Sequence, residues 1–310
     1  MSKKHIIITG GAGFIGSHLC REFISRDYDV YVIDNFTTGD INNLTNIDVK
    51  AILKGNSAFV NIPSEWHKDL AAIVHLGIPS SSPLYRKNPF NISTAVRSYV
   101  NMLELAKEAR VPLLYASSSS LYNGIEDQEE SAIPLVKDYY TEARFFLERL
   151  AALYKELHGV RSVGFRFFSV YGPNEKYKKT FANIITQFLE IMGNRKPPTI
   201  YGDGMQTRDF IYVTDLVKII ADSLERIDEV PSVMNIGTGV ETSFNDVVKI
   251  INNELKTNIA PRYIRNPIQN YVQKTQMSPL SQFHHVFPGF EFVSVETGIR
   301  LLLERRQQDL

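Results

Sequence analysis

Tyr140 and Arg144 stand four residues apart at the start of a segment with helical periodicity. A helix places residues at i and i+4 on one face, so the guanidinium would lie beside the phenol. A phenol has an ordinary pKa of about 10, and a fixed positive charge nearby lowers that pKa. The pair therefore has the composition of a base for proton transfer near neutral pH. Tyr139 is a competing candidate, but the residue four positions after it is Ala143, which carries no charge.

Glycines recur at every third position, at Gly10, Gly13 and Gly16, between an apolar run at 5–9 and a helical pattern. A loop in this place must turn sharply, let its backbone approach a pyrophosphate and pack helix against strand, and each demand selects glycine. The helix N-terminus then stabilises the phosphates. Asp34 ends the next apolar run, where a carboxylate accepts ribose hydroxyls and repels a 2′-phosphate. These features predict a site for NAD rather than NADP.

Short β-branched runs alternate with helical patterns through the first half of the chain. We expect strands at 5–9, 28–34, 58–62, 72–76, 111–116 and 161–168, and helices at 17–25, 96–110 and 141–157. This alternation is typical of an α/β fold with a doubly wound, mainly parallel (Rossmann) sheet. After residue 173 the pattern becomes irregular, with a helix ending near 192, a loop-rich tail over 261–288 and a last helix at 294–306.

The organisation follows from this change of pattern. We expect an NAD-binding domain over 1–172, to which 207–236 returns. A smaller, partly interleaved substrate-binding domain is expected over 173–310.

The composition excludes several classes of protein. Lys+Arg and Asp+Glu both total 34, so the formal net charge is zero, whereas a nucleic-acid binder usually has a basic face. The single cysteine, Cys20, excludes an intramolecular disulfide and fits a reducing compartment. No apolar run approaches the ~18 residues of a membrane span, and the histidines lack metal-ligand spacing. We expect a cytoplasmic protein that binds neither nucleic acid, membrane nor metal.

The glycine loop, the stretch from Asp34 to Gly39 and the Tyr140–Arg144 pair resemble the extended short-chain dehydrogenases/reductases that act on nucleotide sugars. The resemblance covers nearly the whole chain. It implies hydride transfer with NAD, assisted by a Ser or Thr, a Tyr, and a Lys four residues after the Tyr. Arg144 stands where the family has this lysine, which also contacts the nicotinamide ribose. Arginine keeps the charge but differs in reach and donor directions.

The resemblance also implies which residues line the cofactor. In the family, an aspartate and an apolar residue after the third strand contact the adenine, and we place these at Asn61 and Ile62. The family's Leu-Ala-Ala after the fourth strand corresponds to Leu76, Gly77 and Ile78. The full implied set is Gly10, Gly13, Phe14, Ile15, Gly16, Asp34, Asn35, Asn61, Ile62, Leu76, Gly77, Ile78, Tyr140 and Arg144.

A run of four serines ends the strand expected at 111–116. Counting back from Tyr122, which matches the family's Val-Tyr-Gly stretch, the resemblance places the catalytic hydroxyl on Ser118. Dehydrating members resemble Thr-Asp-Glu here because water loss needs an added acid and base, and decarboxylating members keep the Glu. Ser119 and Ser120 supply no carboxylate. The sequence therefore disfavours dehydration strongly and decarboxylation less strongly.

Later motifs match the family's substrate-binding stretches. Ser169 replaces an asparagine that contacts the phosphates, and Asn183 matches another. Arg208 corresponds to an arginine that pairs with the diphosphate, a role that suits a bidentate guanidinium, and we expect Asp209 to fix backbone. Arg265 is the nearest candidate for a second diphosphate arginine. The implied substrate contacts are Ser118, Ser169, Asn183, Tyr201, Arg208 and Arg265.

We therefore expect an NAD-dependent nucleotide-sugar 4-epimerase acting on a UDP-hexose of the UDP-glucose/UDP-galactose type through a transient 4-keto sugar. The alternatives are a nucleotide-sugar 4-dehydrogenase or ketoreductase, then a decarboxylase, then a non-catalytic NAD sensor suggested by Arg144. The resemblance implies a homodimer formed by the helices at 96–110 and 141–157. The second helix carries many apolar residues for one face of a sheet, namely Phe145, Phe146, Leu147, Leu150, Ala151 and Tyr154.

Overall fold

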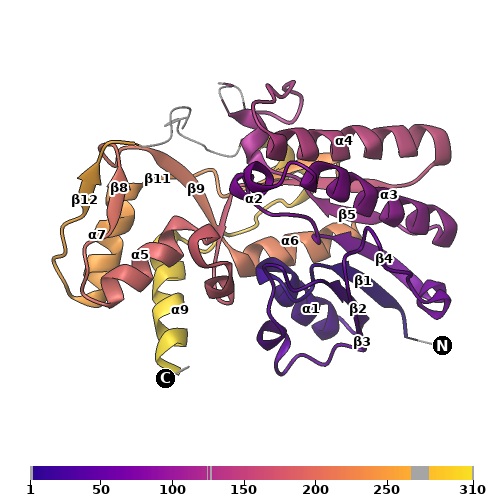
Figure 1. Ribbon diagram of the computed structural model, residues 1–310, viewed down its shortest axis with the longest axis horizontal. Coiled ribbons are helices and arrows are strands. Elements are labelled where there is room, and N and C mark those ends of the chain that lie inside the picture. The colour runs from indigo at the N-terminus through magenta and orange to yellow at the C-terminus, as the bar shows by residue number, and fades with distance from the viewer. Residues whose placement is uncertain (1–2, 124, 126–127, 267–278, 309–310) are drawn as a thin grey trace. The chain divides into compact units, whose positions relative to one another are not determined.

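A computed structural model describes residues 3–123, 125, 128–266 and 279–308 (Figure 1). Contacts divide the chain into two units. Unit 1 comprises Met1–Leu121, Ile133–Arg166 and Val217–Met234, and unit 2 comprises Tyr122–Ala132, Phe167–Leu216 and Asn235–Leu310. By these contacts, the later segment that belongs to unit 1 is 217–234, within the expected 207–236. The expected division into cofactor and substrate domains concerns binding and stays a prediction.

Seven strands form one sheet in the order β10-β6-β5-β4-β1-β2-β3. Strands β1 to β6 pair in parallel. Because β1 has β4 on one side and β2 on the other, the winding reverses there, and such sheets bind ligands at the carboxyl ends beside this point. The expected doubly wound fold is confirmed. The strands are β1 His5–Thr9, β2 Asp29–Asp34, β3 Ala51–Lys54, β4 Leu70–His75, β5 Leu113–Ala116, β6 Ser162–Phe167 and β10 Val233–Ile236.

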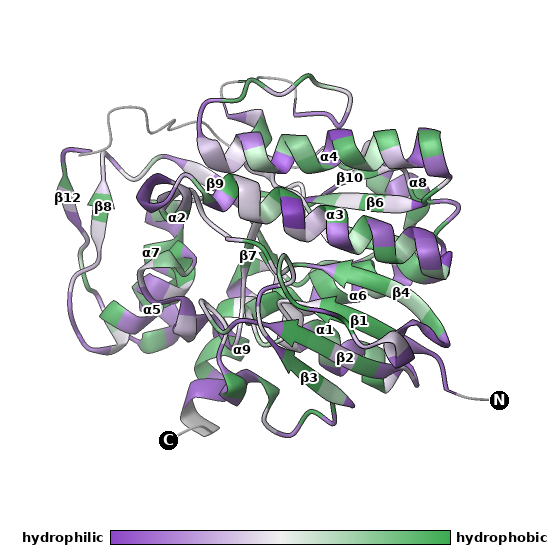
Figure 2. Ribbon diagram, turned by 45° about the vertical axis from the view of Figure 1, so that its right-hand side comes forward, coloured by the Kyte–Doolittle hydropathy of each residue, from purple (hydrophilic) through white to green (hydrophobic). Residues whose placement is uncertain are grey.

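Two long helices, α3 (Asn91–Ala109) and α4 (Tyr139–His158), lie side by side along the sheet (Figure 1). They share a buried apolar cluster with one face of the strands, including Ile7, Ile73 and Leu113. Side chains alternate along a strand, so the neighbours of Ile7 lie on the opposite face of the sheet. In Figure 2, strands β1 to β4 are mainly green, the colour of hydrophobic residues. Burial on both faces explains the apolar run from Ile6 to Ile8 in the centre of β1.

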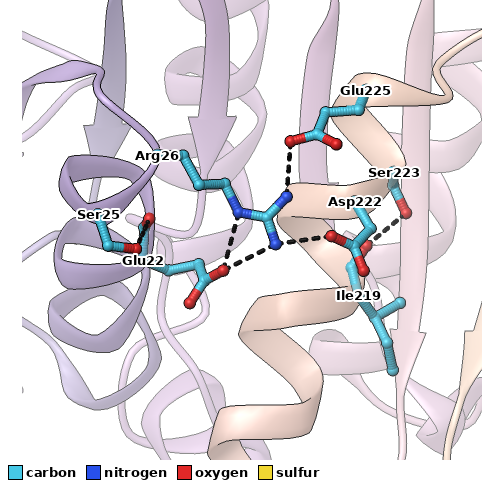
Figure 3. A network of polar contacts seen from close by, with 7 residues as sticks. All are labelled: Glu22, Ser25, Arg26, Ile219, Asp222, Ser223 and Glu225. Carbon is cyan, nitrogen blue, oxygen red and sulfur yellow. Dashed lines mark hydrogen bonds and ion pairs between the residues drawn. The ribbon is translucent and has the colours of Figure 1, made fainter.

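Helix α1 (Phe14–Ser25) is linked to α6 (Val213–Glu225) by a network around Arg26 (Figure 3). The guanidinium donates to Glu22 (2.8 Å), Asp222 (2.6 Å) and Glu225 (2.7 Å). Single exposed ion pairs contribute little, but one guanidinium shared by several carboxylates forms a network with better geometry. This network holds the returning part of α6 to unit 1.

Unit 2 has two small sheets, ordered β11-β9-β7 and β12-β8. Its strands are β7 Ser169–Tyr171, β8 Thr199–Tyr201, β9 Thr207–Tyr212, β11 Glu241–Ser243 and β12 Arg262–Ile264. Its helices are α5 Ile184–Gly193, α7 Phe244–Leu255, α8 Ser281–Val286 and α9 Val295–Gln308. Helices α5, α7 and α9 bury one apolar cluster with β9, centred on residues such as Phe188, Phe210 and Ile299.

One expected strand is wrong. Residues 58–62 form no strand, and the third strand is Ala51–Lys54, the outer partner of β2. The apolar run at 58–62 is β-branched, but the amides of Phe59 and Val60 bond the carbonyl of Asn56 in a turn (2.8 and 3.1 Å). In β3, burial alternates from residue to residue, which is the pattern of an edge strand with one solvated face.

The other expected elements are present with shifted ends. Helix α1 begins at Phe14 rather than 17, and α3 begins at Asn91 rather than 96. A short helix, α2 (Ser82–Lys87), was not expected. No helix in the described part of the chain is both long enough and apolar enough to cross a membrane.

Candidate active site

Helix α4 begins immediately before Tyr140, and its first turn is capped. Asp138 accepts a hydrogen bond from the Thr141 amide (2.8 Å) and another from the Ser82 hydroxyl of α2 (2.6 Å). Burial raises the pKa of Asp138, but these hydrogen bonds outweigh burial, so the pKa lies below its usual value. A charged N-cap stabilises the helix start. The cap thereby fixes the backbone that carries Tyr140.

Tyr140 and Arg144 lie together on α4, as their spacing predicts. The Arg144 guanidinium lies over the Tyr140 ring, with Cζ 5.0 Å from the ring centre. Tyr140 is 9% and Arg144 4% exposed. Arg144 Nη1 donates to the carbonyl of Ala116 (2.7 Å) and Nη2 to that of Pro79 (3.2 Å). A buried positive charge thus stands beside a nearly buried phenol, pinned to main-chain oxygens.

Glu148 ties the same face of α4 to the ends of two strands. Its carboxylate accepts both a bidentate pair from Arg166 (3.0 and 2.8 Å) and a hydrogen bond from Ser117 (2.5 Å). All three side chains are buried, and such a pair needs this full set of hydrogen bonds to offset desolvation. Ser118, next to Ser117, is therefore held at the end of β5, where its Oγ accepts from the Ser120 amide (3.1 Å).

The glycine loop has the geometry that a dinucleotide needs. Gly10 has φ +73°, and a Cβ added to Gly16 would lie 2.1 Å from the Gly10 carbonyl oxygen. Gly13 caps α1 without a side-chain hydrogen bond, so the first amides of the helix remain available for phosphate. Phe14 is buried behind this turn, and Ile15 follows it.

Asp34 lies beside this loop at the end of β2. Its carboxylate accepts from the amides of Ala12 (2.9 Å) and Phe36 (2.8 Å). Burial raises the pKa of Asp34, partly offset by these amides. Each carboxylate oxygen has a second lone pair for a ribose hydroxyl. Loop and carboxylate together fit the pyrophosphate and ribose of NAD. Asn35 is exposed and accepts from the Thr37 amide (3.0 Å).

The loop after β4 is held by a buried pair that sequence reasoning missed. The Gly77 amide donates to Thr9 Oγ1 (2.9 Å), which also bonds His75 Nδ1 (2.8 Å). A Cβ on Gly77 would lie 2.9 Å from Thr9 Oγ1, which explains glycine where the family has alanine. Burial, and then the charge of Arg144, lower the pKa of His75 to about 3. This neutral histidine therefore fixes the stretch Leu76–Ile78 predicted to line the cofactor.

The assignment of Asn61 and Ile62 to the adenine rests on the misplaced third strand. Because β3 ends at Lys54, Asn56 lies two residues after the strand and Asn61 lies seven residues after it. Asn61 is exposed, and Ile62 packs against the apolar cluster of α3. The reason given for choosing these two residues is therefore wrong, while the contact with the adenine stays a prediction.

The predicted substrate residues lie in unit 2, apart from Ser118. Ser169 begins β7. The Asn183 side chain caps α5 by accepting from the Ile185 amide (3.0 Å), and it donates to the Val170 carbonyl (3.0 Å). Tyr201 ends β8 and is 39% exposed. Arg265 is exposed after β12.

Two neighbours on β9 have different roles. Arg208 packs its guanidinium over the Phe244 ring and donates to the Thr207 carbonyl (2.6 Å). Asp209 is fully buried and accepts from the amides of Thr238 (2.7 Å) and Gly239 (2.8 Å), so its expected role in fixing backbone is confirmed. Among the described residues, no cluster of His, Cys, Asp or Glu could hold a metal ion.

A doubly wound sheet, a glycine loop with an acidic partner, and a buried phenol beside a cation define a dinucleotide-dependent enzyme of the α/β class. Residues 6–237 match the family described as the NAD dependent epimerase/dehydratase family. The chain belongs to this family, whose cofactor is NAD.

Three known proteins illustrate what this chain is similar to. The chain is 26% identical to the solved UDP-N-acetylglucosamine 4-epimerase of Methanobrevibacter ruminantium, in complex with UDP-N-acetylmuramic acid, with a TM-score of 0.90 over 100% of both chains. It is 25% identical to the UDP-glucose 4-epimerase of Thermotoga maritima with UDP-glucose, with a TM-score of 0.85 over 98% of this chain and 99% of that one. It is also 33% identical over 261 residues to UDP-glucuronic acid decarboxylase 1 of Arabidopsis thaliana, covering 80% of this chain and 58% of that protein.

Proposed function

We propose that this protein is an NAD-dependent 4-epimerase of UDP-linked hexoses. The observation that carries the proposal is the placement of Arg144 over the Tyr140 ring, at 5.0 Å, in a site whose strand-end residues Ser119 and Ser120 offer no carboxylate. The two epimerases similar to this chain, one solved with UDP-glucose and the other with UDP-N-acetylmuramic acid, support the choice of a UDP-linked sugar.

In this proposal Tyr140 removes the proton of the sugar 4-hydroxyl while its phenolate is stabilised by Arg144. Ser118 hydrogen-bonds the same hydroxyl and holds it in line. Bound NAD supplies the acceptor and then the donor of the hydride at sugar carbon 4. Tyr140 returns its proton when the sugar, after turning, regains its hydroxyl with the opposite configuration. The net reaction consumes no oxidant, because the hydride and the proton both return.

The remaining predicted residues would bind the two nucleotides. Asp34 would accept the ribose hydroxyls of NAD and repel the 2′-phosphate of NADP, so we expect tighter binding of NAD by calorimetry. Asn61 and Ile62 stay the proposed adenine contacts, with Asn56, nearer to the end of β3, as a further candidate. Arg208 would pair with the substrate diphosphate, with Ser169, Asn183, Tyr201 and Arg265 around it.

A decarboxylase is the second candidate because of the 33% identity to a UDP-glucuronic acid decarboxylase. Serine at 119 and 120 speaks against it. A dehydrogenase or ketoreductase would use the same Tyr140 chemistry but release an oxidised or reduced sugar.

One experiment separates these reactions. The purified protein is incubated with UDP-glucose, UDP-N-acetylglucosamine or UDP-glucuronate and trace NAD, and the sugars are followed by NMR. We expect the 4-epimer to accumulate to equilibrium with no net NADH. Formation of a pentose, or stoichiometric NADH, would replace the proposal with the decarboxylase or the dehydrogenase.

We also propose a homodimer built on α3 and α4. Helix α4 carries an apolar stripe of Phe146, Leu150, Leu153 and Leu157, in which Phe146, Leu153 and Leu157 are exposed. Their spacing places them on one face, and exposed apolar stripes mark interfaces. Figure 2 shows apolar segments along this helix. Light scattering should give a dimer for the wild type and a monomer for Leu153→Glu.

A further inference from the structure

The segment from Pro79 to Arg86 joins the loop that follows β4 to the catalytic helix at three points. Its Pro79 carbonyl accepts from Arg144 (3.2 Å), and its Ser82 hydroxyl donates to the N-cap Asp138 (2.6 Å). The third point is Tyr85, whose ring meets the Tyr140 ring at a centroid distance of 5.7 Å and an angle of 65°. Short helix α2, which carries Tyr85, is therefore fastened to the first turns of α4.

Tyr85 is an unusual residue for this position. Its side chain is completely buried, and its hydroxyl has no hydrogen-bond partner among the residues that the structure describes. It forms a small cluster with Tyr140 and Ala143, against which Ile92 packs. A buried unpaired hydroxyl costs about 1–3 kcal/mol. Packing does not explain this hydroxyl, and the part of Tyr85 that contacts Tyr140 is its ring.

The chain's arginine explains why a ring is needed. A lysine ammonium on a flexible stem could follow the phenol wherever it moved. Arg144 cannot, because the carbonyls of Ala116 and Pro79 hold its two terminal nitrogens. The alignment of charge and phenol therefore depends on where the Tyr140 ring is held, and an edge-to-face neighbour restricts that ring.

The other ionisable groups around this cluster leave Arg144 as its cation. Burial raises the pKa of Tyr85 to about 12, so Tyr85 stays neutral although Arg144 lies near it. His75 on β4 is neutral because its pKa is lowered to about 3. Asp138 has Arg86 of α2 close to its charge. Tyr85 and His75 therefore add no charge to this cluster.

We propose that Tyr85 is a positioning residue whose ring holds the ring of Tyr140 against the pinned guanidinium of Arg144. The proposal rests on the proposed role of Tyr140 as the base. Tyr85 acts through its ring edge and not through its hydroxyl, which makes the conservative variant a direct test.

The test compares Tyr85→Phe, Tyr85→Leu and a control on α4, Tyr154→Leu, in which the Tyr154 hydroxyl that bonds Glu104 on α3 (2.7 Å) is lost. We expect Tyr85→Leu to lower kcat by about tenfold or more with KM changed by less than about threefold, since small misplacements of a reacting group are costly. Tyr85→Phe should keep wild-type kinetics, with equal or higher thermal stability. Tyr154→Leu should keep kcat. If Tyr85→Leu folds poorly, Tyr85→Met fills more of the volume without an aromatic edge.

A second readout does not depend on turnover. In protein with labelled tyrosines, NMR measures the flipping rate of the Tyr140 ring, whose signals are identified by their loss in Tyr140→Phe. We expect slow flipping in the wild type and in Tyr85→Phe, and faster flipping in Tyr85→Leu. Wild-type flipping and kcat in Tyr85→Leu, or equal loss of kcat in Tyr85→Phe, would overturn the proposal. If no sugar is turned over by the wild type, the proposed function fails while the flipping result still decides the role of Tyr85.

Discussion

The predicted catalytic residues of unit 1 and the predicted substrate residues of unit 2 are built differently. Tyr140, Arg144 and Ser118 are all buried, and the two terminal nitrogens of Arg144 and the Ser118 hydroxyl bond main-chain groups. Tyr201 and Arg265 of unit 2 are exposed. The first set has its geometry from folding alone. In unit 2, Asn183 and Arg208 are also held by hydrogen bonds, whereas Tyr201 and Arg265 have freedom that a ligand would have to remove.

This difference separates reaction from recognition. A proton transfer tolerates little misplacement, so its groups belong on helices and strand ends that the core fixes. Recognition of a particular sugar nucleotide can be adjusted on loops and sheet edges without disturbing that core. Substitutions in unit 1 should therefore act on kcat, and those at the exposed positions of unit 2 should act on KM.

The largest expected effect is that of Tyr140→Phe, which removes the proposed base. Turnover should fall by about 10³-fold or more, at the upper part of the range for general acid–base groups. NAD binding, measured by calorimetry, should stay within about threefold, because the glycine loop and Asp34 are unchanged. Retained turnover would show that another residue is the base, and the contrast drawn between the two units would then lack its catalytic residue.

The next effect concerns the pinned charge. Arg144→Met removes the cation beside the phenol and leaves the carbonyls of Ala116 and Pro79 without their donor. The rate at neutral pH should fall by about 10- to 100-fold, as expected when a close opposite charge is lost. Part of the rate should return at high pH, where a phenol ionises unaided. Arg144→Lys should retain much of the activity. A wild-type pH–rate profile for Arg144→Met would show that Arg144 is not the activating charge.

A matched pair in unit 2 tests the other side of the comparison. Arg208→Ala should raise the KM for the nucleotide sugar by about 10- to 100-fold, the worth of a charge-assisted hydrogen bond, with kcat changed much less. Arg265→Ala, at an exposed loop position, should change KM by about threefold or less. A loss of kcat in Arg208→Ala would mean that Arg208 takes part in the reaction geometry after all.

The last prediction concerns stability rather than rate, and it is a pH dependence that comes from unit 1. In the unfolded chain His75 binds a proton below its ordinary pKa of 6.5, while in the folded chain burial lowers that pKa to about 3. The free energy of unfolding should therefore have its highest value above pH 6.5. It should decrease as the pH drops from 6.5 towards 3, by up to about 1.4 kcal/mol per pH unit. Fluorescence of Trp66, which is buried in unit 1, reports the transition. Its slope should be flatter in His75→Gln; an unchanged slope would assign the acid sensitivity to another group.

The sequence predicted the strands and the glycine loop because local chemistry decides them. Glycine at 16 is demanded by a contact within the loop itself, and glycine at 10 by its positive φ. The three central residues of β1, Ile6 to Ile8, are apolar because both faces of the strand are covered. The strand expected at 58–62 was wrong for a different reason. This run forms a turn because the carbonyl and the side chain of Asn56 accept its amides, and a hydropathy pattern does not register such local hydrogen bonds.

The supports of the site were beyond the sequence because they come from distant segments. Tyr85 and Tyr140, and likewise Thr9 and Gly77, are brought together only by the winding of the sheet. Each of these residues alone reads as ordinary core or turn. The residues predicted to take part in the reaction belong to a recognisable sequence motif. The residues that hold them in place belong to no motif and are identified only from their contacts in the structure.

The acceptors that hold Arg144 are main-chain oxygens, at Ala116 and Pro79. A carbonyl oxygen is present whatever side chain stands at its position, so neither acceptor can be lost by a point mutation. Lysine and arginine codons can differ by a single nucleotide. An ancestor with lysine here could have acquired the arginine in one mutational step, with its binding partners already in place. A single mutation is thus enough to place arginine at position 144, and no second mutation is needed to supply its hydrogen-bond acceptors.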